Sequence, residues 1–370
     1  MRAGFLKALA AIVLLILLVV VASVLFLARA GAPKIGGKAG LPPFPYWKNI
    51  LPPPGQMFEA LCADRPDIRR IEGKPVMVRH YPEDYMKSDA ISNHFTEDAR
   101  IDCRFAGRPS PREMWSRQVG PKAAFASELE AREAVYSSTR ECNTFNPAYA
   151  RWIIEYTAGK GARVLDPSAG WGDRLIGAIA ADAALYHGFD PNQRLQDGYT
   201  ELVQELAGGN AAYAVTPIKF EEAKLRENFY DVVLSSPPYF TLEDYEPKME
   251  AERAKSKRNT HRHGHRRGLE TAEGYGTYEQ WLQKMYHPYL RNSYRAVRPG
   301  GWVAIYVEDW GGRPSSGQRP QYPLREETVK VLAELGAERR SDLGLLVETA
   351  SAPNQGRIRW AVLFKKPETA

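Results

Sequence analysis

The sequence predicts a mostly parallel α/β sheet of seven strands that ends in an antiparallel hairpin, preceded by a transmembrane helix. Three observations predict it. From about residue 141, short apolar segments alternate with segments of helical periodicity, the pattern of parallel strands joined by crossover helices. Segments 343–348 and 358–364 are separated by a turn rich in Pro, Asn and Gly, which predicts the hairpin. Residues 8–28 are uncharged and almost all apolar.

The remaining strands and the helices follow in order along the chain. Strands are expected at 163–165, 184–189, 211–218, 229–234 and 301–307, and helices at 123–136, 172–182, 278–289 and 326–335. The segment 229–234 is apolar at its centre, as expected of a strand buried on both faces. Because ligands of such sheets bind at the carboxyl ends of the strands, the residues that follow each strand are the candidates for a functional site.

The apolar segment 8–28 is long enough to cross a bilayer as a helix of about 30 Å. A cleaved signal peptide is the alternative, with Ala28-Arg29-Ala30 as its cleavage site, but its apolar region usually has only about 7–15 residues. The lysines and arginines that follow the segment slightly outnumber those before it, which favours a single-pass anchor with the catalytic body on the cytoplasmic side.

The composition indicates four successive regions. Residues 1–30 form the predicted anchor, and 31–56, rich in proline, form an extended linker. Residues 57–140 are an accessory region of no legible function, and 141–370 are the predicted α/β domain, with an insert at 241–277. An ordinary content of apolar and charged residues, 44% and 25%, excludes global disorder. The three cysteines, Cys62, Cys103 and Cys142, lack metal-ligand spacing and suit a reducing compartment in which thiols stay free.

The loop after the first expected strand reads Asp-Pro-Ser-Ala-Gly-Trp-Gly from Asp166 to Gly172. Gly170 and Gly172 permit a tight turn and the close approach of a ligand. The third glycine of the dinucleotide fingerprint is replaced by Leu175. A carboxylate at Asp166 would repel a pyrophosphate but would pair with the ammonium group of S-adenosylmethionine. Asp190, after the second strand, is placed to accept hydrogen bonds from ribose hydroxyls.

The fourth of these strands ends in Ser236-Pro237-Pro238-Tyr239. Two successive prolines must end the strand and hold the backbone in one direction. An exocyclic amine on a nucleobase is a poor nucleophile because its lone pair is delocalised into the ring. If the Ser236 hydroxyl and the Pro237 carbonyl accept its hydrogens, they favour a localised lone pair and stabilise the developing positive charge. Tyr239 offers a face on which an extruded base could stack.

These motifs resemble the class I, Rossmann-like S-adenosylmethionine-dependent methyltransferases, and more narrowly the DNA amino-methyltransferases that modify cytosine N4 or adenine N6. The resemblance spans about residues 141–367 and includes Tyr278–Leu282 and Arg298–Gly301. It implies catalytic roles for Ser236, Pro237, Pro238 and Tyr239. It implies cofactor contacts by Phe145, Pro147, Asp166, Ser168, Gly170, Gly172, Asp190 and Glu221. Serine at position 236 is commonest in the cytosine-N4 enzymes. C5 methylation needs a cysteine nucleophile after the catalytic strand, and none is present there.

The segment 252–268 carries a charge of +6, equal to the net charge of the whole chain. Contact with nucleic-acid phosphates is the expected role, and its candidate residues are Lys255, Lys257, Arg258, Arg262, Arg266 and Arg267. A solvated loop and contact with anionic lipid headgroups remain alternatives. His261, His263 and His265 alternate with Arg and Gly. The arginine charges disfavour a cation and no acids cluster there, so no metal site is expected.

The sequence thus predicts an enzyme that methylates the exocyclic amine of a DNA base, with cytosine N4 favoured over adenine N6. Three alternatives stay open: an RNA substrate, a protein side-chain amide, and a membrane-tethered nucleic-acid-binding module without catalysis. Either residues 57–140 read the target or the sequence specificity is low. The oligomeric state is not predicted.

Overall fold

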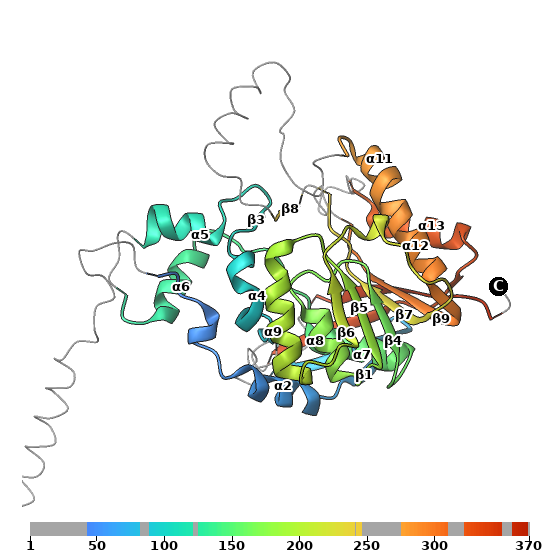
Figure 1. The fold of residues 1–370 in the computed structure, drawn as a ribbon, viewed down its shortest axis with the longest axis horizontal. Coiled ribbons are helices and arrows are strands. Elements are labelled where there is room, and N and C mark those ends of the chain that lie inside the picture. The colour runs from blue at the N-terminus through green and yellow to red at the C-terminus, as the bar shows by residue number, and fades with distance from the viewer. Residues whose placement is uncertain are drawn as a thin grey trace, which may run out of the picture.

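The computed structural model describes residues 43–81, 89–120, 125–240, 242–245, 275–309, 322–349 and 357–368. Its centre is one ten-stranded sheet in the order β1-β2-β11-β12-β9-β7-β4-β5-β6, with β10 beside β12 (Figure 1). The strands of this sheet are β1 Asp67–Ile71, β2 Lys74–Tyr81, β4 Arg163–Asp166, β5 Leu185–Phe189, β6 Tyr213–Thr216, β7 Tyr230–Ser235, β9 Val297–Tyr306, β10 Glu338–Arg339, β11 Leu343–Thr349 and β12 Arg359–Lys365. A separate ribbon pairs β3 Arg104–Phe105 with β8 Glu243–Asp244.

Ten α-helices, counted within the described residues, accompany the sheet. They are α2 Pro54–Ala63, α4 Asn93–Arg100, α5 Pro111–Met114, α6 Glu128–Tyr136, α7 Pro147–Thr157, α8 Asp173–Ala180, α9 Gln196–Ala207, α11 Tyr278–Trp281, α12 His287–Ala296 and α13 Leu324–Glu334. A π-helical turn, η5 Leu282–Tyr286, joins α11 to α12.

The sheet is mostly parallel with an antiparallel C-terminal hairpin, as the sequence predicted, and its strand order is doubly wound. β6, β5, β4, β7 and β9 are parallel in this order, so the strand order reverses between β4 and β7. β12 is antiparallel to both β9 and β11, which confirms the C-terminal hairpin. This is the Rossmann-like arrangement, in which ligands bind where the strand order reverses.

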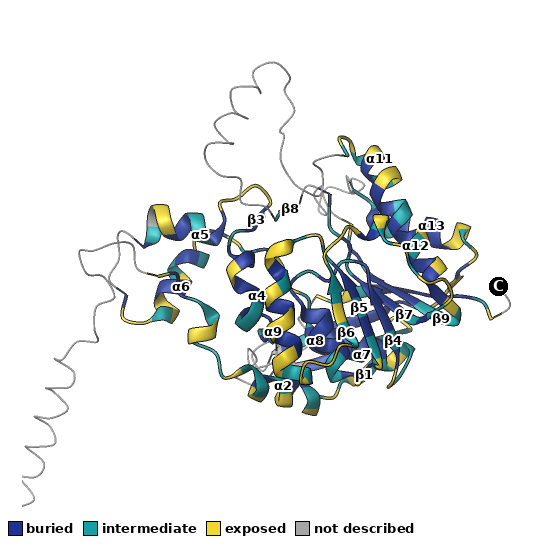
Figure 2. Cartoon of the chain, viewed as in Figure 1, coloured by how far each residue is buried: buried dark blue, intermediate teal, exposed yellow. Residues whose placement is uncertain are grey.

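Apolar side chains alternate between the two faces of the sheet. Along β7, Val232 and Leu234 join the core beneath α7 and α8, whereas Val233 joins the core beneath α12. Figure 1 shows α8 and α9 on one side of the strands and α12 and α13 on the other. The central strands are buried along most of their length (Figure 2). Because both faces are covered, the carboxyl ends of the strands are where a ligand can reach the sheet.

The sheet is wider than the seven strands expected, because the region 57–140 contributes to it. β1 and β2 form a hairpin, and β2 pairs in parallel with β11, with Leu345 opposite Met77. β10 adds a further short strand beside β12. The helices α2 and α4 of the same region pack against α9. The predicted boundary at residue 141 therefore separates two segments of chain that share one sheet.

The prediction of a transmembrane helix is contradicted by the helices that the structure describes. None of those in the described residues has both the length and the apolar character needed to cross a bilayer. The longest single α-helix described, α9, has 12 residues, about 18 Å. The longer run α11–η5–α12 carries charged residues. Segment 8–28, on which the prediction was based, lies outside the described residues. The predicted single-pass anchor, and the cytoplasmic placement of the body that rested on it, are therefore not supported.

The prediction that the thiols stay free is also corrected. Cys103, next to β3, and Cys142 form a disulfide with their Cα atoms 6.0 Å apart, and Cys62 is free. Both bonded cysteines are fully buried. The two residues are distant in sequence, so only folding could bring them together. Cysteine usage therefore no longer supports a reducing compartment.

Candidate active site

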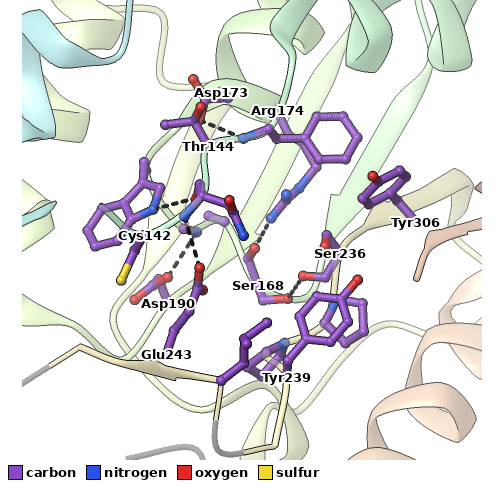
Figure 3. Close-up of a pocket in the computed structure, with 18 of the residues that line it drawn as sticks. Cys142, Thr144, Ser168, Asp173, Arg174, Asp190, Ser236, Tyr239, Glu243 and Tyr306 are labelled. Atoms are coloured by element: carbon purple, nitrogen blue, oxygen red, sulfur yellow. Dashed lines mark hydrogen bonds between the residues drawn. The ribbon is translucent and has the colours of Figure 1, made fainter. Parts of the chain in front are cut away.

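One cavity of about 1040 Å³ lies at the carboxyl ends of the parallel strands. Ser168 and Gly170 reach it from the loop after β4, Asp190 from the end of β5, and Ser236 from the end of β7. Figure 3 shows Ser168 and Ser236 joined by a hydrogen bond, with Tyr239 and Tyr306 beside them. The loop predicted to bind a cofactor and the corner predicted to be catalytic therefore face the same cleft.

The structure divides the predicted site residues into three groups. Those that line the cavity are Phe145, Ser168, Gly170, Asp190, Glu221, Ser236, Pro237, Pro238 and Tyr239. Pro147, Asp166 and Gly172 are not among its lining residues. The six basic residues, Lys255, Lys257, Arg258, Arg262, Arg266 and Arg267, lie outside the described residues, as do the three histidines of that segment.

The glycines of the first loop have different structural roles. Gly170 has φ +60° and lines the cavity, where a Cβ would lie no closer than 3.9 Å to another atom. Gly172 has φ +93° and is the N-cap of α8, and a Cβ there would meet a methyl group of Leu202 at 3.2 Å. Gly170 therefore permits a ligand to approach, whereas Gly172 permits the chain to turn into a helix packed against α9.

Asp166 faces the protein interior rather than a ligand. It is fully buried, and its Oδ2 lies 2.8 Å from Nε of Arg174 and accepts a 2.7 Å hydrogen bond from the Tyr186 hydroxyl. Its Oδ1 accepts a 2.6 Å hydrogen bond from the Ser235 hydroxyl. A carboxylate with these partners has its charge compensated inside the protein, so the structure does not place it toward a cofactor ammonium group as expected.

Asp190 does face the cavity, at the end of β5. Its Oδ2 accepts a 2.9 Å hydrogen bond from the Gly170 amide, and its Oδ1 accepts one of 2.9 Å from the Asn192 amide. Desolvation raises the pKa of Asp190 to about 6. Each carboxylate oxygen can accept more than one hydrogen bond, so the ionised group still has acceptor capacity for hydroxyls in the cavity.

The segment before α7 forms another wall. The Asn146 side chain accepts a 2.9 Å hydrogen bond from the Tyr149 amide, and Pro147 occupies the first helical turn, so the helix begins here. Phe145 lines the cavity edge-on to Tyr306, with their ring centroids 5.4 Å apart, and its amide donates to Asp173. Burial raises the pKa of Asp173 to about 6.

The corner predicted to be catalytic is held on two sides. The Ser236 carbonyl accepts a 3.0 Å hydrogen bond from the Ser168 hydroxyl. The Tyr239 hydroxyl accepts one of 3.1 Å from the Glu308 amide, and burial raises the pKa of Tyr239. Neither contact could be read from the sequence, because each joins segments more than 60 residues apart.

Sequence reasoning missed a cluster around Asn143. The Asn143 amide donates a 2.9 Å hydrogen bond to Glu243, and its carbonyl accepts one of 3.0 Å from the Trp171 indole. Glu243 is buried, which raises its pKa, and it also accepts a hydrogen bond from the Tyr245 hydroxyl. The cluster joins the segment before α7, the cofactor loop and the segment after the corner. An acid four residues beyond Tyr239 was the only sequence signal for it.

Arg174 was also missed, although it lines the cavity. Its guanidinium lies over the Phe145 ring, 5.1 Å from the centroid, and pairs with Asp166. Its sequence signal was an arginine near the start of an otherwise apolar helix. Such an arginine is expected to be buried, and a buried guanidinium requires a partner of opposite charge. In the described residues, no group of three or more His, Cys, Asp or Glu side chains is arranged to hold a metal ion.

No protein-family model and no curated protein matches the sequence. Three solved structures illustrate what the fold is similar to. A SAM-dependent O-methyltransferase from Thermotoga maritima is 11% identical, with 61% of this chain and 67% of that chain covered and a TM-score of 0.36. The 1,6-didemethyltoxoflavin-N1-methyltransferase of Burkholderia thailandensis, with bound S-adenosylhomocysteine, is 14% identical, with 60% and 78% covered and a TM-score of 0.37. The N-methyltransferase NodS from Bradyrhizobium japonicum is 10% identical, with 60% and 94% covered and a TM-score of 0.36. Similarities this distant do not identify a reaction, and the fold class of this chain rests on its own strand order.

Proposed function

We propose that this protein transfers a methyl group from S-adenosylmethionine to the exocyclic amine of a nucleobase in DNA, with cytosine N4 as the favoured target. The observation that carries the proposal is the shared cavity. Ser168, Gly170 and Asp190 line one part of it, and Ser236–Tyr239 line another. A methyl donor and an acceptor amine must meet in one cleft, and this cleft joins the two motifs at the point where the strand order reverses.

The residues of the cavity suit S-adenosylmethionine. A volume of about 1040 Å³ exceeds what one small ligand commonly needs, so it leaves space for a second group. Asp190 would accept hydrogen bonds from ribose hydroxyls, and Glu221 would lie toward the adenine. At the Phe145 end, Asp173 and Arg174 offer opposite charges to an ammonium and a carboxylate group. When bound, S-adenosylmethionine supplies a methyl group activated by its sulfonium charge.

The corner would position the target amine. Ser168 occupies the Ser236 carbonyl, which leaves the Ser236 hydroxyl and the Pro237 carbonyl to accept the two N–H groups of the amine. Their dipoles favour a localised lone pair on the nitrogen and stabilise the positive charge that develops on it. Because the two prolines fix the backbone, little reorganisation is needed when the amine enters.

The Tyr239 ring of the corner would hold the base. The Glu308 amide fixes the hydroxyl end of Tyr239, so the ring has one orientation against the cavity. An extruded base can stack on such a ring. The basic segment 252–268 follows the corner in sequence and supports a polyanionic substrate. Serine rather than asparagine at position 236 counts against a protein amide as the target.

The test incubates the full chain with tritiated S-adenosylmethionine and unmethylated double-stranded DNA, then digests the DNA to nucleosides for mass spectrometry. The expected product is N4-methylcytosine. N6-methyladenine would assign the alternative base, and label found only with an RNA substrate would change the polymer. Label confined to protein, or no label with any substrate, would reject nucleobase methylation.

A further inference from the structure

Where the wall of the cavity meets the core, four side chains form a polar node, and of these only Ser168 has a part in the proposed reaction. The Ser235 hydroxyl donates to Oδ1 of Asp166 over 2.6 Å. Oγ of Ser168 lies 3.1 Å from Oγ of Ser235 and 3.1 Å from the Tyr289 hydroxyl. The Ser168 hydroxyl is also 3.0 Å from the Ser236 carbonyl. The node therefore joins the end of β4, the end of β7 and helix α12.

Each hydroxyl in the node has a single hydrogen to donate, and this orders the node. A carboxylate paired with Arg174 only accepts, so Ser235 gives its hydrogen to Asp166. A carbonyl also only accepts, so Ser168 gives its hydrogen to Ser236. Tyr289 then donates to Ser168. This assignment gives every hydroxyl hydrogen of the node an acceptor, as a rigid buried network needs. It leaves no hydrogen between the Ser168 and Ser235 oxygens, which are 3.1 Å apart.

The node clamps the catalytic corner from both sides. Ser235 directly precedes Ser236, and its bond to Asp166 ties the end of β7 to the end of β4. The bond from Ser168 fixes the Ser236 carbonyl, and Tyr289 fixes Ser168 from the opposite face of the sheet. Asp166 and Ser235 are 0% exposed and Tyr289 is 1% exposed, so water is excluded from the Ser235–Asp166 bond, whereas Ser168 is half-buried at the cavity wall.

We propose that Ser235 and Tyr289 are positioning residues, which with Asp166 and Ser168 aim the Ser236–Tyr239 corner at the acceptor amine. This inference rests on the proposed function, since it concerns the same corner. It gives Asp166 an anchoring role in place of the expected contact with the cofactor. A misplacement of about 1 Å at a reacting centre can cost about 100-fold in rate, so loosening the corner should lower turnover more than binding.

The experiment compares two variants with two matched controls in the full chain. Ser235→Ala and Tyr289→Phe each remove one hydroxyl of the node. Tyr289→Phe deletes a single oxygen atom, so it still tests the node if Ser235→Ala folds poorly. Ser293→Ala removes a buried hydroxyl that only donates to the Tyr289 carbonyl within α12, at 2.7 Å. Tyr286→Phe removes a buried hydroxyl that lies 2.6 Å from Thr328. The controls thus lose equivalent atoms nearby without touching the corner.

Three readouts are measured: S-adenosylhomocysteine affinity by calorimetry, kcat and KM for DNA, and hydrogen exchange of amides within residues 230–240. We expect kcat to fall about tenfold or more in Ser235→Ala and Tyr289→Phe, with affinity and KM changed less than about threefold. Exchange near Tyr239 and Phe240 should accelerate in these two variants and stay unchanged in the controls.

Two results would overturn the inference. One is unchanged kcat and exchange in both variants. The other is a loss of S-adenosylhomocysteine affinity that parallels the loss of kcat, because the node would then support only the cofactor loop. Failure of the wild-type chain to methylate any nucleobase would instead reject the proposed function, and exchange and affinity would still decide whether the node holds the corner.

Discussion

Arg174 and Asp166 form a buried ion pair directly behind the cofactor loop. Nε of Arg174 lies 2.8 Å from Oδ2 of Asp166, and the two side chains are 7% and 0% exposed. The charge of Asp166, the last residue of β4, is therefore compensated within the protein. Arg174 also lines the cavity. The ion pair therefore ties the loop at residues 166–172 to the protein core.

Asp166→Asn should lower the free energy of unfolding by about 3–5 kcal/mol, because it leaves the Arg174 charge buried without a counter-ion. Urea unfolding followed by circular dichroism measures this change. Asp182→Asn is the matched control, since Asp182 is exposed and has a positive φ of 55°, which asparagine tolerates. Unchanged stability together with weakened S-adenosylhomocysteine binding would show that Asp166 contacts the ligand after all.

Cofactor affinity should depend on pH through Asp190. Its pKa of about 6 in the folded protein is above the ordinary value of 3.8. The carboxylate that we propose accepts ribose hydroxyls is therefore fully present well above pH 6 and is lost as the pH falls through 6. Calorimetry with S-adenosylhomocysteine between pH 7.5 and 5 should show affinity falling toward the acid end, by at most about tenfold per pH unit from this group.

Asp190→Asn should weaken binding at pH 7.5 and remove the part of the pH dependence that Asp190 causes. Asp182→Asn should keep the wild-type profile. An Asp190→Asn protein with wild-type affinity at pH 7.5 would exclude the assigned contact. A wild-type profile that stays flat down to pH 5 would show that the neutral acid binds equally well.

Ser236→Ala should lower kcat by about 100-fold, because it removes one of two acceptors for the amine while the Pro237 carbonyl remains. The affinity for S-adenosylhomocysteine should stay within about twofold, since the backbone contacts of the corner are kept. Single-turnover methylation of DNA measures the effect. Ser341→Ala, at an exposed position, is the control. Retention of full activity by Ser236→Ala would refute the assigned role of the hydroxyl.

The disulfide between Cys103 and Cys142 should stabilise the fold by about 4 kcal/mol, from the loop entropy of its 39-residue separation. The double variant Cys103→Ala/Cys142→Ala should show this loss in urea unfolding, and Cys62→Ala should show little change. Alkylation of the wild-type chain in denaturant without reductant should label Cys62 alone. Labelling of all three cysteines would contradict the bond.

Sequence patterns were sufficient for the seven expected strands of the α/β domain, though not for the short β10, and for the meeting of the two motifs at one edge of the sheet. Segments such as 229–234 are apolar at their centre because they are buried on both faces, so they can be recognised locally. The motifs at Asp166–Gly172 and Ser236–Tyr239 follow parallel strands, and parallel strands end at the same edge of a sheet. That the two motifs meet in one cavity therefore follows from the parallel arrangement of their strands.

Partners that are far apart in sequence could not be predicted. β2 pairs with β11 across more than 260 residues, and neither strand carries a local signal for the other. The Asn143–Glu243 hydrogen bond and the Cys103–Cys142 disulfide likewise join residues that are far apart in the sequence. The sequence therefore predicts only an accessory region for residues 57–140, whereas two of their strands belong to the main sheet.

The succession of strands along the α/β domain, the glycine loop and the proline corner can be recognised from the sequence alone, because periodicity, glycine and proline act on the backbone within a few residues. The direction in which Asp166 points, and the hydroxyls that hold Ser236, depend instead on how distant segments pack. The direction of a buried carboxylate depends on where its nearest cation and donors lie. For Asp166 these are Arg174, Tyr186 and Ser235, and packing brings Tyr186 and Ser235 to it from other strands.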